Sequence, residues 1–292
     1  MDFNTLKEKC EYYRQIADYK LLPNSYVMIM LDGRSFSKKI KNKFDKPFDR
    51  DFGRMMDETT KYLCENIQGA LLGYCQSDEI HIVVADHVRQ DEGANTSTSS
   101  FFGYRMCKVL SIAAALATSK FNQLMMDYRV ANVESNSGCA GDTIDDCRQA
   151  IMNSPLYEFD CKAWNIPNTN DTFAWILYRQ IDCIRNSKQQ LAQTYLPHKQ
   201  LVGKHTDEQI AMLKNEKNID WYKDVAQGFK FGRFCHRVTV DMHSELFGDY
   251  TRKMWKTKPA YELTNTEAEH DFDIKEVIVG KIYHEDKDGK IV

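Results

Sequence analysis

The stretch Tyr26-Val27-Met28-Ile29-Met30-Leu31 is an unbroken apolar run, and Asp32-Gly33-Arg34 follows it directly. Turn residues at Pro23-Asn24-Ser25 and at Gly33 bound the run, so it predicts a buried strand. Asp32 then stands at the carboxyl end of that strand. Burial of an ionised carboxylate is costly unless the group is paired or binds a metal. Asp32 is therefore the first candidate functional residue.

A second carboxylate motif, Gln76-Ser77-Asp78-Glu79, follows a second apolar run that begins at Ala70. Apolar residues resume at Ile80, so strands are predicted at 70–76 and 79–85, with the polar residues beside a tight hairpin. Mg²⁺ usually takes one or two protein carboxylates together with phosphate oxygens and water. The two motifs together predict a two-metal magnesium site for a triphosphate. The structural alternative is a turn at the first motif and a cap or ion-pair partner in the second.

The order of predicted elements indicates the fold class. A helix is predicted near residues 52–67, then the two strands, then a long alanine-rich helix over 101–122 carrying Arg105 and Lys108 on one face, and a strand at 157–164. This β-α-β-β-α-β order predicts an α+β fold with a polymerase-palm-like, ferredoxin-like antiparallel sheet and helices on one face. Nucleotide cyclases share that arrangement, so the fold alone does not choose the activity.

The remainder of the chain predicts a C-terminal helical and β extension. Apolar residues at helical spacing over 173–191 predict a long amphipathic helix that displays Arg179, Asp182 and Arg185 on its surface. We predict a palm-like domain over residues 1–165 and a second region over 166–292. The other expected segments are a surface excursion at 132–155, a polar helix at 204–220, and strands and turns at 228–240 and 272–292.

Charge restricts how the protein would bind nucleic acid. The formal net charge is −3 and the pI is near 6.3, so no overall basic field attracts RNA, and any binding must use local patches. One lysine-rich segment directly follows the first carboxylate, either as a phosphate-facing patch or as a solvated loop. Its basic residues are Arg34, Lys38, Lys39, Lys41, Lys43 and Lys46.

Cysteine usage and hydropathy indicate the compartment. The nine cysteines include no CxxC pair, which predicts reduced thiols, and the eight histidines form no ligand-spaced cluster with them, so zinc is not expected. No apolar run is long enough to span a bilayer, and the N-terminus lacks the apolar core of a signal peptide. We predict a soluble cytoplasmic protein without a membrane partner, with an organellar location left open.

Several motifs in a fixed order resemble the tRNA-histidine guanylyltransferase family, from about residue 5 to about residue 235. They are Asp32-Gly33-Arg34-Ser35-Phe36, Phe44-Asp45-Lys46-Pro47, Gln76-Ser77-Asp78-Glu79, Arg105 with Lys108, Phe159-Asp160, and Arg179-Gln180-Ile181-Asp182-Cys183. The chain is most similar to the guanylyltransferase-like branch of template-directed 3′-to-5′ RNA polymerases. That branch is favoured by Arg185-Asn186-Ser187 and Leu201-Val202-Gly203-Lys204, followed by Glu208 and Met212-Leu213.

The resemblance implies roles for three groups of residues. Asp32, Asp78 and Glu79 would be catalytic, and Asp32, the Gly33 carbonyl and Asp78 would hold two Mg²⁺ ions. Backbone N–H groups from Asp32 to Ser37 would surround a triphosphate. The nucleotide-binding residues would be Asp32, Gly33, Arg34, Ser35, Phe36, Ser37, Lys46, Ser77, Asp78, Arg105 and Lys108. The RNA-binding residues, mostly in the C-terminal region, would be Lys162, Arg179, Arg185, Asn186 and Lys204.

The resemblance also implies a reaction and an assembly. ATP would adenylylate the 5′-monophosphate end of a tRNA or tRNA-like RNA, and the 3′-hydroxyl of GTP or another nucleoside triphosphate would then displace AMP. The family commonly forms a homotetramer, with the C-terminal region taking part in RNA binding and assembly.

Departures from the family pattern bear on specificity. Ile184 stands where the guanylyltransferases proper have a histidine linked to reading the histidine anticodon, and an apolar side chain makes no hydrogen bonds to base edges. Cys75 replaces a usual glycine, and Ser37 replaces a usual histidine. Lys162 stands where the family commonly has an arginine, so the positive charge is kept but the two-pronged hydrogen bonding of a guanidinium is lost.

Three hypotheses follow from these residues. The favoured one is template-dependent repair of tRNA 5′ ends, and the second is addition of a single 5′ G to histidine tRNA, against which Ile184 argues. The third is a nucleotide- or RNA-binding palm without polymerase activity, or a cyclase. The intact carboxylates Asp32 and Asp78 argue against an inactive module.

Overall fold

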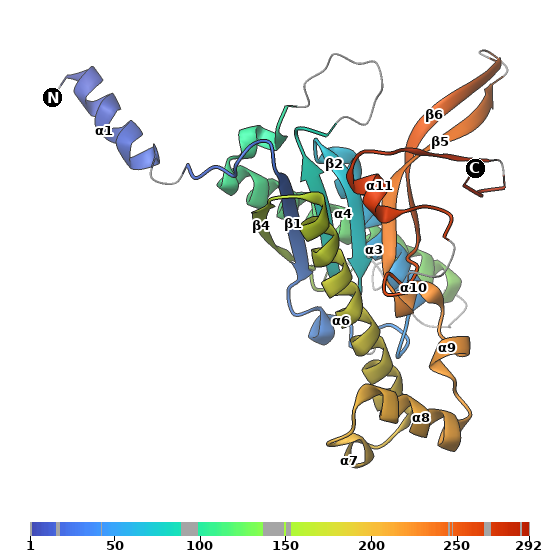
Figure 1. Cartoon of the computed structure of the whole chain (residues 1–292). Helices are drawn as coiled ribbons and strands as arrows, with labels where there is room; N and C mark the ends of the chain where they lie inside the picture. The colour runs from blue at the N-terminus through green and yellow to red at the C-terminus, as the bar shows by residue number, and fades with distance from the viewer. Residues whose placement is uncertain are drawn as a thin grey trace.

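A single sheet organises the molecule in the computed structural model of the chain (Figure 1), and its strands follow the order β4-β1-β3-β2-β5-β6, with β7 parallel to β5. The structure describes residues 2–15, 18–41, 43–88, 99–136, 149, 153–244, 246, 248–265, 270–286 and 288–291. Most of the predicted excursion at 132–155 lies outside these residues.

The predicted palm is confirmed in order and in strand pairing. It runs β1 (Tyr26–Gly33), α3 (Arg50–Asn66), β2 (Ala70–Gln76), β3 (Glu79–Ala85), α4 (Met106–Asn136) and β4 (Phe159–Ile166). These four strands are antiparallel neighbours in the order β4-β1-β3-β2. The two hairpin strands begin and end where the sequence predicts, and β1 extends two residues past the apolar run to include Asp32 and Gly33.

Helices α3 and α4 cover one face of the sheet. Alternate β1 residues Val27, Ile29 and Leu31 are buried there together with Met56 of α3 and Phe121 of α4. Each large apolar side chain fully buried in this way contributes about 1.5–3 kcal/mol. This core holds the carboxyl end of β1 in place.

The opposite face is covered as well, which corrects the expectation of helices on one face only. Tyr26 and Met28 of β1 pack there with Ile176 of α6 (Thr169–Tyr195) and Ile274 of α11 (Ile274–Ile278). An unbroken apolar strand is typical of a sheet buried on both faces, and β1 has that pattern. The second layer comes from the C-terminal region.

The predicted helix over 101–122 is displaced and interrupted. A short 3₁₀ helix, η1 (Phe101–Tyr104), comes first, and Arg105 is extended, with φ −65° and ψ 113°. Arg105 bridges Lys20 in a β-type contact and α4 begins at Met106, so Arg105 and Lys108 do not belong to one continuous helix. Helix α4 then continues well beyond the predicted end.

The C-terminal region continues the same sheet. Strands β5 (Arg233–Ser244) and β6 (Gly248–Pro259) form a long hairpin whose far end extends beyond the rest of the sheet in Figure 1, and β7 (Tyr283–Glu285) pairs with β5. Strand β6 lies in the part of the chain for which the sequence gives no prediction. The division at residue 165 stays a prediction, because strands from both sides of it lie in one sheet.

Short helices extend α6 away from the sheet. These are α7 (His198–Leu201), α8 (Thr206–Lys217), α9 (Trp221–Asp224) and α10 (Gln227–Lys230), and they enclose a small core around Leu191 and Trp221. Two other helices lie outside this group: α1 (Phe3–Gln15), which has no buried residue and projects from the body in Figure 1, and α2 (Phe36–Lys39) after β1. None of the helices in the described ranges is long and apolar enough to cross a membrane.

Candidate active site

Acidic residues of three adjacent strands lie side by side in one row across the end of the palm sheet, which we call the carboxylate edge. Asp32 of β1 is paired in register with Glu79 of β3 on one side and with Asp160 of β4 on the other. Residues directly opposite each other on neighbouring strands project to the same face. Asp78 lies next to this row in the turn between β2 and β3, and its carbonyl accepts a 3.1 Å hydrogen bond from the Gly33 N–H. The two predicted motifs therefore meet in space.

The turn that carries Asp78 is held in an uncommon conformation. Ser77 has a φ of +46° and Ser35, in the loop after β1, has a φ of +59°. Non-glycine residues adopt positive φ rarely and at a cost, and such residues cluster at functional sites. The chain therefore adopts strained backbone conformations in both loops that carry the carboxylates, at Ser35 after Asp32 and at Ser77 before Asp78.

The negative charges of Asp32 and Asp78 are poorly compensated by the surrounding protein. Burial raises the pKa of Asp78 to about 6, and the nearby Asp32 carboxylate adds to the shift. Burial also raises the pKa of Asp32, with Glu79 and Asp160 acting in the same direction and Lys162 opposing them. Because burial and neighbouring negative charges disfavour the ionised forms of Asp32 and Asp78, a bound cation would stabilise them.

The donor set suits Mg²⁺ bound jointly with a substrate phosphate. No cluster of three or more His, Cys, Asp or Glu side chains placed to hold a metal occurs within the ranges that the structure describes. Mg²⁺ does not require one, because it commonly binds one or two carboxylates and takes its other ligands from phosphate and water. Asp32 and Asp78 would supply those two carboxylates, an assignment that stays a prediction. The Gly33 carbonyl as a further ligand stays a prediction.

Glu79 differs from the two aspartates because it is fully engaged within the protein. Its carboxylate accepts hydrogen bonds from Arg179 at 2.7 and 2.9 Å, from Gln76 at 3.1 Å, and contacts His81 at 3.2 Å. Burial favours its neutral form, but the His81 contact and the Arg179 charge outweigh burial and lower the pKa of Glu79 to about 2. Glu79 is thus an anchor beside Asp32. Its predicted catalytic role is untested.

Arg179 lies elsewhere than the sequence predicts. It was expected on the surface of the long helix, but only 8% of it is exposed. It turns toward the sheet because Glu79 and Asp182 both bind its guanidinium, the latter at 3.0 Å. The helix surface instead displays Arg185.

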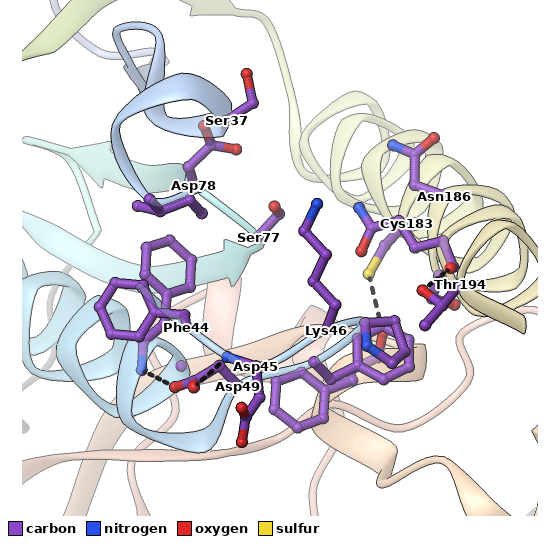
Figure 2. Close-up of a pocket in the computed structure, with 18 of the residues that line it drawn as sticks. Ser37, Phe44, Asp45, Lys46, Asp49, Ser77, Asp78, Cys183, Asn186 and Thr194 are labelled. Carbon is purple, nitrogen blue, oxygen red and sulfur yellow. Dashed lines mark hydrogen bonds between the residues drawn. The ribbon is translucent and has the colours of Figure 1, made fainter. Parts of the chain in front are cut away.

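A cavity of about 650 Å³ opens beside Asp78. Figure 2 shows the Lys46 amine extending into it, between the Ser77–Asp78 turn and the side chains of Cys183 and Asn186 on α6. Besides charged residues, the cavity is lined by a group of aromatic rings and by neutral amides on α6. The rings are Phe44, Phe48, Phe52 and Phe229, and the amides are Asn186, Gln190 and Gln193.

The loop after β1 is only partly available for phosphate. The Gly33 N–H is bonded to Asp78, and the Arg34 N–H donates to the Glu158 carbonyl at 2.8 Å. The expectation that successive N–H groups from Asp32 onward surround a triphosphate is therefore wrong for these two residues. Gly33 is needed for packing instead, because a Cβ there would lie 2.6 Å from the Phe36 ring.

Two predicted nucleotide-binding residues lie far from the carboxylates within one chain. Arg105 and Lys108 stand where α4 begins, next to Tyr19, whose carbonyl accepts from the Met106 N–H at 2.7 Å. Further along the same helix, the Thr118 hydroxyl accepts a 3.2 Å hydrogen bond from the Phe159 N–H. Phe159 is the β4 residue paired with Gly33, so Thr118 marks the part of α4 that lies near the carboxylates. An α-helix rises about 18 Å between residues 106 and 118. The chain does not bring these basic groups to its own site.

The predicted RNA-binding residues are also dispersed. Lys162 lies on β4 near Asp32, Asn186 lines the cavity, and Lys204 is exposed in the loop before α8, beyond the far end of α6. The sequence motifs give no role to Gln190, Gln193 or Phe229. The amides could have been found, because Asn186 and Gln190 are four residues apart on the predicted helix and Gln193 continues the same helical spacing just beyond it.

The metal-free protein is expected to lose stability as pH rises, through Asp78. The pKa of Asp78 in the fold is about 6, against 3.8 for an ordinary aspartate, so the folded state binds this proton more tightly. That contribution is present in full below the ordinary aspartate pKa of 3.8 and is lost as pH rises past 6. The full loss is about 3 kcal/mol, of which about 2 kcal/mol falls between pH 4.5 and 7.5. It is measured as the difference in free energy of unfolding between wild type and Asp78→Asn at pH 4.5 and 7.5. Equal differences at both pH values would contradict the raised pKa.

A palm-like sheet with paired carboxylates beside a cavity is the arrangement of the palm-type nucleotidyltransferases. The family model for tRNAHis guanylyltransferase (Thg1) matches residues 7–167, so the chain belongs to this family, whose members are nucleotidyltransferases.

Individual proteins are similar to this chain over most of its length. An uncharacterized protein, R259, of Acanthamoeba polyphaga mimivirus is 26% identical over 207 residues, which cover 70% of this chain and 68% of that protein. The tRNA(His) guanylyltransferase of Neurospora crassa is 24% identical over 181 residues, covering 61% of this chain. The chain spans only about half of the Neurospora enzyme, 52% of its length.

Solved structures share the fold. A bacterial tRNA(His) guanylyltransferase (Thg1)-like protein in complex with ATP is 27% identical with a TM-score of 0.71, covering 94% of this chain and 99% of that one. The tRNA(His) guanylyltransferase of Saccharomyces cerevisiae has a TM-score of 0.57 over 76% of this chain and 90% of that one, at 20% identity, which supports the fold alone.

Proposed function

We propose that this protein adds nucleotides in the 3′-to-5′ direction to the 5′ end of tRNA, after activating that end with ATP and choosing each nucleotide by pairing with the opposite strand. One observation carries the proposal: Asp32 and Asp78 lie together with raised pKa values, and Asp78 lines a cavity into which Lys46 extends. The relative bound to ATP supports a nucleoside triphosphate as ligand.

The proposed reaction has two transfers. In the first, an oxygen of the RNA 5′-phosphate attacks the α-phosphorus of ATP and pyrophosphate leaves. In the second, the 3′-hydroxyl of the incoming nucleotide attacks the activated 5′-phosphate and AMP leaves. Both transfers move a phosphoryl centre and need little covalent chemistry from the protein, so positioning and charge neutralisation supply most of the rate.

The chain's own groups would do this work as follows. Asp32 and Asp78 would hold two Mg²⁺ ions, which when bound neutralise phosphate charge and activate the attacking oxygen. Lys46 would neutralise phosphate oxygens from the opposite side of the cavity, and the hydroxyls of Ser37 and Ser77 line the same space.

End repair is favoured over addition of a single G by the surroundings of Ile184. This side chain packs, half-buried, against the small core formed by α6 and the short helices. It neither carries a hydrogen-bonding group nor projects as a reader of anticodon bases would. The homotetramer and the cytoplasmic location stay predictions.

The substrate distinguishes the two alternatives. We expect the protein, with Mg²⁺, ATP and all four nucleoside triphosphates, to extend a tRNA lacking its first nucleotide until the acceptor stem is fully paired, and then to stop. An intact tRNA should remain unextended. Extension of intact histidine tRNA by one G alone would favour the second hypothesis, and no extension of either RNA would exclude both.

Lys46 should act on nucleotide binding. Replacing Lys46 by methionine keeps the length of the side chain but removes a charge that faces the phosphates, so KM for the triphosphate should rise about tenfold. Lys38→Met is the matched control, since this exposed lysine belongs to the same basic segment but does not line the cavity. Steady-state kinetics at saturating RNA measures both. A similar rise in the two variants would contradict a specific role for Lys46.

A further inference from the structure

A continuous chain of polar contacts joins the carboxylate edge of the sheet to helix α6. It begins at His81 of β3, which is completely buried between Glu79 and Trp175. The Trp175 Nε1–H donates to His81 Nδ1 at 3.4 Å, and His81 Nε2 lies 3.2 Å from the Glu79 Oε2. The Trp175 ring is itself packed edge-on against Trp164, with ring centroids 4.7 Å apart.

These contacts define which nitrogen of His81 carries the proton. Since Trp175 has only a donor to offer, Nδ1 must accept, and Nε2 must carry the hydrogen that is donated to Glu79. Burial lowers the pKa of His81, which agrees with a neutral ring in this tautomer. His81 is thus a fixed donor that holds one oxygen of the Glu79 carboxylate.

Beyond Glu79 the chain reaches the cavity. Arg179 binds both Glu79 oxygens and also Asp182, and Asp182 accepts a 3.3 Å hydrogen bond from the Asn186 side chain. Asn186 lines the cavity wall. The Glu79 carboxylate therefore contacts, directly or through Arg179 and Asp182, both the residues next to Asp32 and the side chain of Asn186 at the cavity.

The charge of Arg179 makes the position of Glu79 important. Glu79 stands opposite Asp32 in register, and Arg179 lies against Glu79. While Glu79 is held in place, its negative charge offsets the guanidinium. If the carboxylate turned away, the Arg179 charge would no longer be offset and would repel a divalent cation at the neighbouring Asp32 and Asp78.

We propose, on the basis of the function proposed above, that His81 and Trp175 are positioning residues which fix the Glu79 carboxylate against Arg179 and thereby maintain the affinity of the Asp32–Asp78 pair for divalent cations. Nothing in the proposed chemistry requires His81 to contact substrate. Its effect is exerted entirely through Glu79.

Direct binding of Mn²⁺ tests this positioning role without depending on activity. Free Mn²⁺ is measured by electron paramagnetic resonance during titration of the purified full-length protein. His81→Leu removes the donor to a charged acceptor and should weaken Mn²⁺ binding about tenfold. His81→Gln places an amide nitrogen near the former Nε2 and should restore affinity to within about twofold of wild type.

Two further variants complete the set. Trp175→Phe keeps an aromatic ring but removes the donor that fixes the tautomer, so an intermediate loss of about threefold is expected. His236→Gln is the matched control, because His236 is equally buried but lies on β5, away from this chain of contacts. It should bind Mn²⁺ as wild type does.

The outcomes separate this inference from the proposed function. If His81→Leu binds Mn²⁺ as wild type does, or if wild type binds none, the positioning role is wrong. Equal losses in His81→Leu and His81→Gln would also overturn it, since a packing defect would then explain both. If wild type transfers no nucleotide to any RNA, the proposed function fails, while the comparison of Mn²⁺ affinities still decides the role of His81.

Discussion

Replacement of Asp78 by asparagine should lower the rate of nucleotide transfer at least about a thousandfold while the protein remains folded. The substitution keeps the shape of the side chain but removes one of the two carboxylates that would bind the divalent cations. The initial rate of RNA extension at saturating substrates measures the effect. Asp32→Asn is expected to behave alike, because the two carboxylates face the same site.

Stability distinguishes this loss from misfolding. Since burial makes the Asp78 charge unfavourable in the metal-free protein, Asp78→Asn should unfold at a temperature several degrees higher than wild type at pH 7.5. Asp127→Asn is the matched control, an exposed aspartate on α4, and should change neither rate nor stability. An active Asp78→Asn enzyme would contradict the assignment of the site.

The second large effect is expected on the fold. Arg179→Met should lower the free energy of unfolding by about 3 kcal/mol, because it leaves the mostly buried Glu79 without its cation and removes one of the two cations that pair with Asp182. Denaturant unfolding followed by circular dichroism measures this change. The change in transition midpoint should occur without a change in slope, as expected when the folded state alone is affected.

A double substitution tests the origin of that loss. Adding Glu79→Gln to Arg179→Met removes the unpaired charge and should restore part of the lost stability, so the two effects should be less than additive. The control is Arg185→Met, because Arg185 also pairs with Asp182 but its side chain is 61% exposed, and exposed pairs contribute little. Additive losses in the double variant would contradict a direct pair between Arg179 and Glu79.

The palm could be predicted because its signals are local. The β1 run is short and bounded by turn residues, the hairpin at Ser77–Asp78 interrupts two apolar runs, and both features determine where the strands end. The meeting of Asp32 with Asp78 follows from that register. The motifs shared with the family indicate the same residues.

Other features depend on contacts between distant parts of the chain. The inward turn of Arg179 requires Glu79, which is 100 residues earlier in the sequence, and helical spacing carries no sign of it. The break before α4 depends on residues 19–21, which bond to η1 and to the start of the helix. Strand β6 is polar and mostly exposed, so its sequence lacks the alternation that would have identified a strand.

The site shows the same division. Lys46 and Asp78 were found from their motifs, whereas the amide wall of α6 becomes part of the site only because α6 packs across the sheet toward the cavity. The Gly33 and Arg34 N–H groups are not free to bind phosphate, because they donate to the carbonyls of Asp78 and Glu158. Both acceptors are distant in the sequence, so no local pattern predicts these bonds.

The central claim is that Asp32 and Asp78 serve ATP-dependent activation of an RNA 5′ end, and its most direct test is to look for the activated intermediate. A 5′-monophosphorylated tRNA lacking its first nucleotide is incubated with Mg²⁺ and ATP labelled at the α-phosphate, with no other nucleotide present. We predict that label joins the RNA as a 5′-linked adenylate in wild type and is absent with Asp78→Asn. Wild-type protein that leaves the RNA unlabelled, or an equal yield from Asp78→Asn, would contradict the account.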